Sequence, residues 1–239
     1  MTRLFTAELF KTMTTRTLLG FAAAGVVMTV LNVVIVAVAS GDLDALAEKQ
    51  EALTGLPVVI LLLGLVGAAG EYRHGTAAPA ALVARTGRDR LLLARTAAYA
   101  VTGLAVGGLM VAVSLALGLP LLAGHPGPDL TAGQVIPVAE GNIAAAVLFA
   151  IMGVAVGALV RNQVAGVVVL LLMNFVMNPL IVTVDESAAN LTPFGAAEVL
   201  ARMTHDTTLT TGTAALVLTA WTVPLVVAAV ISERRRDLT

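Results

Sequence analysis

The sequence repeatedly runs for long stretches without a charged side chain. Residues 17–39, 97–123 and 164–184 contain no Asp, Glu, Lys or Arg. About 20 predominantly apolar residues are what an α-helix needs to cross the hydrocarbon core of a bilayer. Only 12% of the 239 residues are charged, whereas about 25% are charged in an ordinary soluble domain. The pattern therefore predicts an all-α, polytopic membrane protein.

We expect a single transmembrane domain over residues 1–239, in which six helices cross the bilayer. The first apolar stretch is too long, and followed by too many others, to be a signal peptide. Residues 1–16 place apolar side chains along one helical face between basic residues, which predicts an N-terminal helix lying in the membrane interface. A helical extension of the first span is the alternative for residues 1–16. The expected spans are 17–39, 55–70, 96–123, 139–160, 164–184 and 212–231.

The basic residues indicate which loops face the cytoplasm. All 14 Lys and Arg residues except Lys49 and Arg202 fall at the two termini or in the loops after the second and fourth expected spans. Positively charged loops stay on the cytoplasmic side because they resist translocation. We therefore expect a multi-pass protein of the cytoplasmic (inner) membrane, with its N- and C-termini in the cytoplasm.

Several classes of function need residues that this chain lacks. None of the expected spans carries an ionisable residue at mid-depth, which disfavours an ion-coupled transporter or a proton pump. The chain has no cysteine, and its three histidines are scattered at positions 74, 125 and 205, so we expect no metal site and no cofactor. No Gly-x-x-x-x-Gly-Lys-Ser/Thr loop is present for ATP, and no catalytic constellation is evident. A net charge of −1 gives no reason to expect a nucleic-acid partner.

Polar side chains inside the expected spans are few. Asn174 and Asn178 are four residues apart beside Pro179, so their amides are expected on one helix face, next to a carbonyl that proline leaves free. The pair could line a translocation path, or it could make interhelical hydrogen bonds.

Small residues also recur at helical spacing in two of the expected spans. Gly103 and Gly107, like Gly153 and Gly157, form small-xxx-small faces that allow helices to approach closely. Such faces could serve packing within one subunit or the association of two subunits.

The most distinctive local sequence is the charged hinge between the second and third expected spans. It reads Gly70-Glu71-Tyr72-Arg73-His74-Gly75-Thr76, and a basic run from Arg85 to Arg95 follows. Glu71 and Arg73 can pair with each other or with charges of a partner, and Gly75 allows the chain to turn. The basic run predicts a short cytoplasmic helix with a charged face, although each arginine alone could simply anchor the third span to lipid headgroups.

This hinge resembles the cytoplasmic loop of permease subunits in the second class of ATP-binding-cassette (ABC) exporters. The resemblance implies a coupling helix that docks on a separate nucleotide-binding ATPase subunit, and a second permease copy that forms a homodimer with the first in the lipid bilayer. The chain departs from the family in having Arg85-Thr86-Gly87 where a proline often precedes the basic run. The resemblance assigns ATPase coupling to Glu71, Arg73, Gly75, Thr76, Arg85, Arg88, Arg90 and Arg95.

The expected function is therefore the membrane-spanning part of an ATP-driven exporter of a hydrophobic or amphipathic substrate. The chain itself is not expected to be an enzyme, since ATP hydrolysis would occur on the partner chain. The alternative is a membrane scaffold or sensor subunit without transport activity, and an intramembrane enzyme is disfavoured by the missing catalytic residues.

Overall fold

The computed structural model describes residues 1–39, 43, 45–55, 58–73, 75, 87–203 and 209–236. Within these ranges the chain is helical and contains no strand. The helices are α1 (Thr2–Thr14), α2 (Arg16–Ala39), α3 (Leu46–Ala52), α4 (Val58–Arg73), α6 (Arg88–Leu122), α7 (Ala132–Val160), α8 (Gln163–Leu172), the π-helical segment η1 (Met173–Met177), α9 (Asn178–Val184), α10 (Glu186–Asn190), α11 (Pro193–Leu200) and α12 (Thr211–Arg236).

Five of these helices are long and apolar enough to cross a membrane. They are α2, α6, α7, the continuous run from α8 to α9, and α12. The second expected span corresponds to α4, which has 16 residues and is about 24 Å long at 1.5 Å per residue, less than the ~30 Å of a hydrocarbon core. The all-helical, membrane-type fold is therefore confirmed with five such helices, while the sixth span is not.

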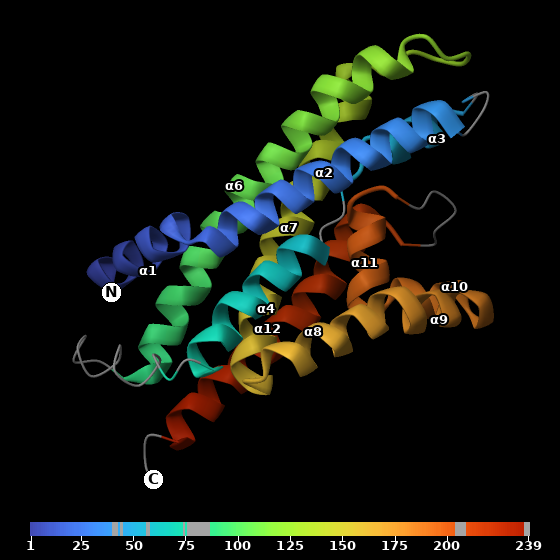
Figure 1. Cartoon of the computed structure of the whole chain (residues 1–239). Helices are drawn as coiled ribbons and strands as arrows, with labels where there is room; N and C mark the ends of the chain where they lie inside the picture. Colours follow the sequence, from blue (N-terminus) through green and yellow to red (C-terminus); the bar gives the residue numbers. More distant parts are fainter. Residues whose placement is uncertain are drawn as a thin grey trace.

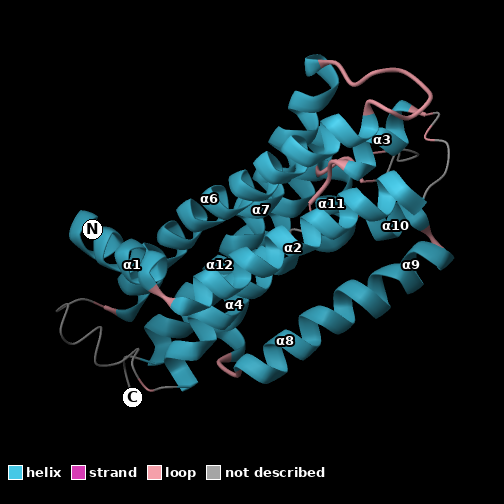
Figure 2. Ribbon diagram, turned by 45° about the horizontal axis from the view of Figure 1, so that its top comes forward, coloured by secondary structure: helices cyan, strands magenta, loops and turns pink. Residues whose placement is uncertain are grey.

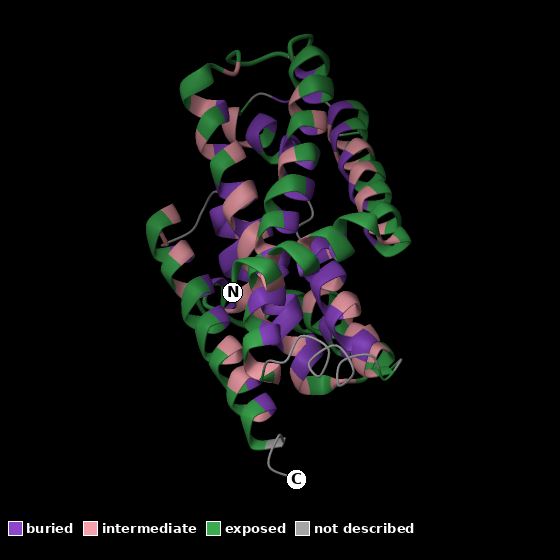
Figure 3. Ribbon diagram, turned by 90° about the vertical axis from the view of Figure 1, so that its left-hand side faces the viewer, coloured by how far each residue is buried: buried purple, intermediate pink, exposed green. Residues whose placement is uncertain are grey.

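Helix α4 is nevertheless central to the bundle. Its side chains Ile60, Leu61, Leu63 and Leu65 are almost completely buried, and its closest packing partner is α7. Figure 3 shows the buried positions concentrated in the interior, while the peripheral helices expose their outer faces. The apolar residues of α4 thus form protein core rather than a lipid-facing surface.

Glycines make the contact between α4 and α7 possible. A Cβ atom on Gly153 would lie 2.1 Å from the Leu61 carbonyl oxygen, and one on Gly64 would lie 2.5 Å from the Ala150 carbonyl oxygen. On the neighbouring helix, a Cβ on Gly103 would lie 2.7 Å from the Ala150 Cβ. Gly107 and Gly157 make equivalent close approaches to α7 and α4. These small-residue faces therefore serve helix packing within one subunit.

The helix boundaries differ from the expected ones in several places. Helix α1 is separated from α2 by Thr15 in an extended conformation, so it is a helix of its own rather than an extension of the first span. Helix α6 begins at Arg88 and α7 at Ala132, eight and seven residues before the expected starts. The first turn of α6 is charged, and the start of α7 contains Gly133, Gln134 and Pro137, so hydropathy alone does not mark either start as part of a span. Helices α3 and α10 lie in loops where none was expected.

The helix from α8 to α9 lies along the outer edge of the bundle, and a π-helical segment interrupts it (Figure 2). The Asn178 N–H donates to the carbonyl of Met173, five residues earlier. Pro179 follows at the start of α9, and because proline has no N–H, the regular hydrogen-bond ladder cannot continue through it. The wider π-helical turn accommodates that break.

Candidate functional site

The described edges of the hinge, at the end of α4 and the start of α6, lie at the same end of the molecule as α1 and the end of α12. In Figure 1 the N-terminus, the C-terminal end of α4 and the start of α6 lie toward the lower left, as does the end of α12, whereas α3, α10 and α11 lie toward the opposite end. We call the first of these the basic end, because it gathers Arg73, Arg88, Arg90 and Arg95 of the hinge together with Arg161 and Arg234.

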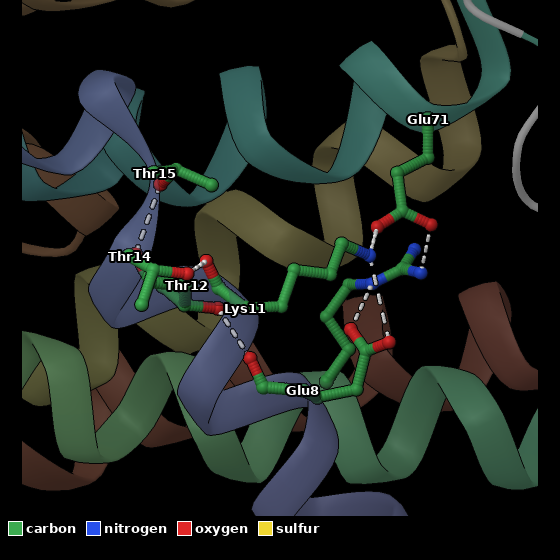
Figure 4. A network of polar contacts seen from close by, with 7 residues as sticks. Glu8, Lys11, Thr12, Thr14, Thr15 and Glu71 are labelled. Atoms are coloured by element: carbon green, nitrogen blue, oxygen red, sulfur yellow. Dashed lines mark hydrogen bonds and ion pairs between the residues drawn. The ribbon is translucent and has the colours of Figure 1, made fainter.

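Four charged side chains from three helices meet at the basic end (Figure 4). Glu71 of α4 makes ion pairs with Arg95 of α6 and with Lys11 of α1. Arg95 Nε also donates to Glu8 Oε2 of α1 at 3.1 Å, and Lys11 Nζ lies 3.5 Å from Glu8 Oε1. We refer to Glu8, Lys11, Glu71 and Arg95 as the ionic cluster.

The ionic cluster is largely withdrawn from solvent. The side chains of Arg95, Glu8 and Glu71 are 3%, 9% and 10% exposed, whereas that of Lys11 is 47% exposed. Buried ions are tolerated only when opposite charges and hydrogen bonds compensate their lost hydration. Two carboxylates and two cations provide that balance here, and the contacts hold α1 against α4 and α6.

A second set of contacts joins the remaining helices at the same end. The buried carboxylate of Glu233 in α12 accepts a hydrogen bond from the Tyr72 hydroxyl at 2.8 Å and pairs with Arg161. Arg161, which follows α7 in a left-handed conformation, also lies over the Tyr72 ring at 4.7 Å from its centroid. Arg234 Nε donates to Asp89 Oδ2 at 2.9 Å. These contacts connect α4 with α7 and α12, and α6 with α12.

The residues predicted for the coupling loop occupy different environments. Glu71 and Arg95 come together in the ionic cluster, whereas Arg73 and Arg90 are exposed and Arg88 is half-buried. Gly75 has a φ of 65°, a left-handed conformation that suits the expected turn. Arg88, Arg90 and Arg95 lie in the first turns of α6 itself. Thr76 and Arg85 lie outside the described residues, as does most of the expected coupling helix.

Sequence reasoning missed two members of the cluster, Glu8 and Lys11. The apolar face of residues 1–16 predicts an interfacial helix, yet the α1 residues that are buried are Glu8 and Thr12, while Phe10 is 71% exposed. The available signal was the pair of opposite charges three residues apart on one helix face. That spacing indicates a local pair, but it does not reveal a partner on another helix.

The two asparagines proposed for a translocation path are not equivalent. Asn178 is buried, and its Oδ1 accepts a hydrogen bond from Thr192 Oγ1 at 2.8 Å. Its Nδ2 donates to Glu198 Oε1 at 3.5 Å. Asn174 is half-buried in η1. Asn178 therefore makes interhelical hydrogen bonds, the second of the two roles considered, and ties α9 to α11.

A recess of about 570 Å³ lies beside the ionic cluster. Its walls include Lys11, Glu71 and Tyr99 together with Gln163 at the start of α8. In the part of the chain that the structure describes, His, Asp and Glu side chains form no group of three that could hold a metal ion.

These features define an all-helical chain whose five long apolar helices fit a multi-pass membrane protein. Comparison with models of known protein families finds no match, and comparison with curated proteins finds none either.

Proposed function

We propose that the chain is the membrane-spanning permease subunit of an ATP-driven exporter of the second ABC class. In this proposal α4 completes a set of six spans, both termini are cytoplasmic, and two copies work with a separate nucleotide-binding ATPase. Support comes from the ordered hinge residues of the sequence and from a fold with several membrane-type helices. Export of a hydrophobic or amphipathic substrate is part of the same proposal.

The observation that carries the proposal is the ionic cluster at the base of the hinge. Glu71 and Arg95 stand on either side of residues 74–87 and pair with each other, and both bind α1. Any displacement of that segment would act directly on α1, α4 and α6 together. A loop that only anchored a span to headgroups would not need a buried connection of this kind.

The proposed mechanism uses the exposed cations of the hinge for docking. Arg73 and Arg90 are exposed at the two edges of the segment and would meet acidic groups of the ATPase. Closure of the ATPase dimer on ATP would then move the ionic cluster and change how the two permease copies pack. The partner shifts that equilibrium only by as much as it prefers one of the two conformations.

A short α4 is compatible with a sixth span. Leu56 and Pro57 precede it in the sequence, and its sides are covered by other helices rather than by lipid. Backbone groups at membrane depth are tolerated when protein surrounds them. In the proposal, α4 is therefore a protein-enclosed span whose polar end carries the hinge.

The test of ATPase docking is a detergent pull-down of the tagged chain from its native membrane. The native chain is expected to recover a nucleotide-binding ATPase, and Arg88→Glu/Arg90→Glu is expected to lose it because two cations of the basic run become anions. Arg3→Glu/Arg16→Glu is the matched control, since it reverses two exposed charges of α1 and α2 outside the hinge. Recovery of no ATPase with the native chain, under conditions that preserve other membrane complexes, would favour the scaffold or sensor alternative.

Coupling is tested separately from docking. Glu71→Ala removes a member of the ionic cluster, and Arg73→Ala removes an exposed cation. Both are expected to uncouple ATP hydrolysis from transport in reconstituted vesicles. Intact coupling in both variants would show that the hinge has no part in transport.

A further inference from the structure

An apolar cavity of about 280 Å³ lies between α7, α12, the helix from α8 to α9, and α11, and it opens at the molecular surface, where Met177, Met173 and Trp221 of its wall are 41%, 44% and 48% exposed. Its walls are formed entirely by hydrocarbon and thioether groups and aromatic rings, although Asn178 and Thr192 are among the residues around it. The polar atoms of these two side chains are turned into the hydrogen bonds with each other and with Glu198. The space has room for roughly nine groups of about 30 Å³, the volume of a water molecule in the liquid.

Three methionines and two aromatic rings contribute to the cavity wall. Met152, Met173 and Met177 are three of the chain's eight methionines. Methionine is unbranched and polarisable, so it adapts to apolar ligands of different shape. Phe194 and Trp221 supply rigid ring surface, and Trp221 is held in place because its Nε1 donates to the Leu191 carbonyl at 2.9 Å.

The π-helical segment forms one side of the cavity. Met173 begins η1 and Met177 ends it, and both line the cavity. π-Helical turns occur mostly as single turns inside α-helices and are frequent at functional sites. Here the segment brings both thioethers to one cavity, while the chain continues as α9 toward the polar contacts of Asn178.

The polar contacts lie at one edge of the cavity only. Asn178 is joined there to Thr192 and Glu198 of the α11 region, whereas Val156 and Leu225 at other positions of the wall are apolar. An alkyl chain in the cavity would therefore place a polar headgroup toward α11. An occupant with polar groups along its length would lose their hydration without gaining partners.

We propose that this cavity binds the hydrocarbon chain of an amphiphile, with the headgroup at the α11 edge. The inference names the substrate class of the proposed exporter and rests on that function for its physiological meaning. Binding of the hydrocarbon chain can be measured with the purified protein alone, without an ATPase. Failure to bind the hydrocarbon chain is therefore distinguishable from failure of the exporter proposal, which the pull-down tests.

The experiment uses Trp221, the only tryptophan in the chain, as a contact reporter. Bromine atoms on an alkyl chain quench tryptophan fluorescence on close approach. The purified chain in nanodiscs of unbrominated phospholipid is titrated with a dibrominated C18 fatty acid, and in a second arm the nanodisc phospholipid itself carries dibrominated chains. Saturable quenching by the fatty acid assigns the cavity to a free amphiphile. If the brominated phospholipid quenches Trp221 and the fatty acid does not displace that phospholipid, the cavity is assigned to a bilayer lipid chain.

Two matched pairs of variants separate the cavity from the surrounding bilayer. Trp221→Phe/Val223→Trp moves the reporter two residues along α12, from a wall position that is 48% exposed to a similarly exposed position outside the cavity wall, where quenching should rise only in proportion to the bulk content of brominated chains. Ile181→Phe fills the cavity and should weaken the saturable phase roughly tenfold, since it displaces about two methylene-sized groups. The adjacent Val182→Phe faces outward and should leave the saturable phase unchanged.

The proposal is overturned if Trp221 and the Val223→Trp reporter are quenched alike and without saturation in both arms. It is equally overturned if Ile181→Phe and Val182→Phe have the same effect. Shielding of Trp221 from both kinds of brominated chain would mean that protein covers the cavity, and this too excludes the proposed occupant.

Discussion

Arg95 is the residue on which the basic end depends most. Its side chain is 3% exposed and binds two carboxylates on different helices. Replacing a whole buried ion pair by apolar groups is often neutral, but removing one partner leaves an uncompensated buried charge. Arg95 is therefore expected to be far more sensitive to substitution than its exposed neighbour Arg90.

We predict that Arg95→Met lowers the free energy of unfolding by about 3–5 kcal/mol, because it removes the buried cation that binds both Glu8 and Glu71. Thermal unfolding of the purified chain in detergent, followed by fluorescence, measures the effect. Arg90→Met is the matched control and should stay within about 0.5 kcal/mol of the native chain. Equal stability of the two variants would contradict a structural role for the ionic cluster.

Glu198 makes the stability of the α11 region depend on pH. Burial raises the pKa of its carboxyl above the ordinary value of 4.5, and the hydrogen bond from Asn178 opposes that rise. Because the folded state holds this proton more tightly than the unfolded state, the contribution to stability is present below pH 4.5 and is lost as the pH rises through the raised pKa.

We therefore predict that Glu198→Gln removes a decline in melting temperature that the native chain shows as the pH increases from 4.5. Trp221 reports the transition, since its indole N–H is bonded to Leu191 beside α11. The exposed Glu186→Gln serves as the control and should keep the native pH profile. A Glu198→Gln profile parallel to that of the native chain would contradict the assignment.

At the scale of elements, the contact between α4 and α7 organises the bundle. It brings backbone against backbone, with Gly153 and Gly64 facing carbonyl oxygens of the opposite helix. Such close approach maximises van der Waals contact where no hydrophobic effect drives helices together. A short α4 can therefore be held firmly by packing alone.

We predict that Gly153→Ala destabilises the fold by about 1–3 kcal/mol or more, since the new methyl group would collide with the Leu61 carbonyl and the helices would have to separate. Gly108→Ala on α6 is the control, because no atom lies within 4 Å of the added methyl group. It should be neutral or stabilising by up to about 1 kcal/mol, from helix propensity. Comparable melting temperatures for both variants would show that the α4–α7 contact is looser than described.

At the scale of the whole molecule, the arrangement of charge predicts its orientation. The described edges of the hinge lie at the basic end with α1 and the end of α12, where Arg161 pairs with Glu233 and Arg234 with Asp89, and cationic loops normally remain in the cytoplasm. The ionic cluster joins α1 to both edges of the hinge, so the proposed topology requires the hinge and the N-terminal helix to share one side of the membrane, with α4 returning the chain across the bilayer.

The chain has no cysteine, so single cysteines can be labelled without background. We predict that Arg3→Cys and Arg90→Cys react with an impermeant maleimide only in permeabilised cells, whereas Ser187→Cys in α10 reacts in intact cells. All three positions are exposed, so reactivity reports sidedness. Labelling of Arg90→Cys from outside, with Arg3→Cys protected, would mean that α4 does not cross.

By itself, the sequence determined the properties that depend on neighbouring residues. Uncharged runs such as 164–184 specify helices of membrane-spanning length, and a glycine at position 75 allows the turn after α4. Hydropathy and backbone freedom are local quantities, so they can be recognised without knowing the fold. The same limit explains why hydropathy predicts late starts for α6, whose first turn is charged, and for α7, whose first residues include Gly133, Gln134 and Pro137.

Only the tertiary structure decided which distant side chains meet. Glu71 pairs with Arg95 and with Lys11, which is 60 residues away in the chain, and Gly153 packs on Leu61 rather than on a second subunit. Many cations could satisfy one carboxylate, and several helices could accept one glycine face. The choice among them depends on how α1, α4, α6 and α7 pack against one another, because burial makes a pairing strong only where the helices bring the charges together.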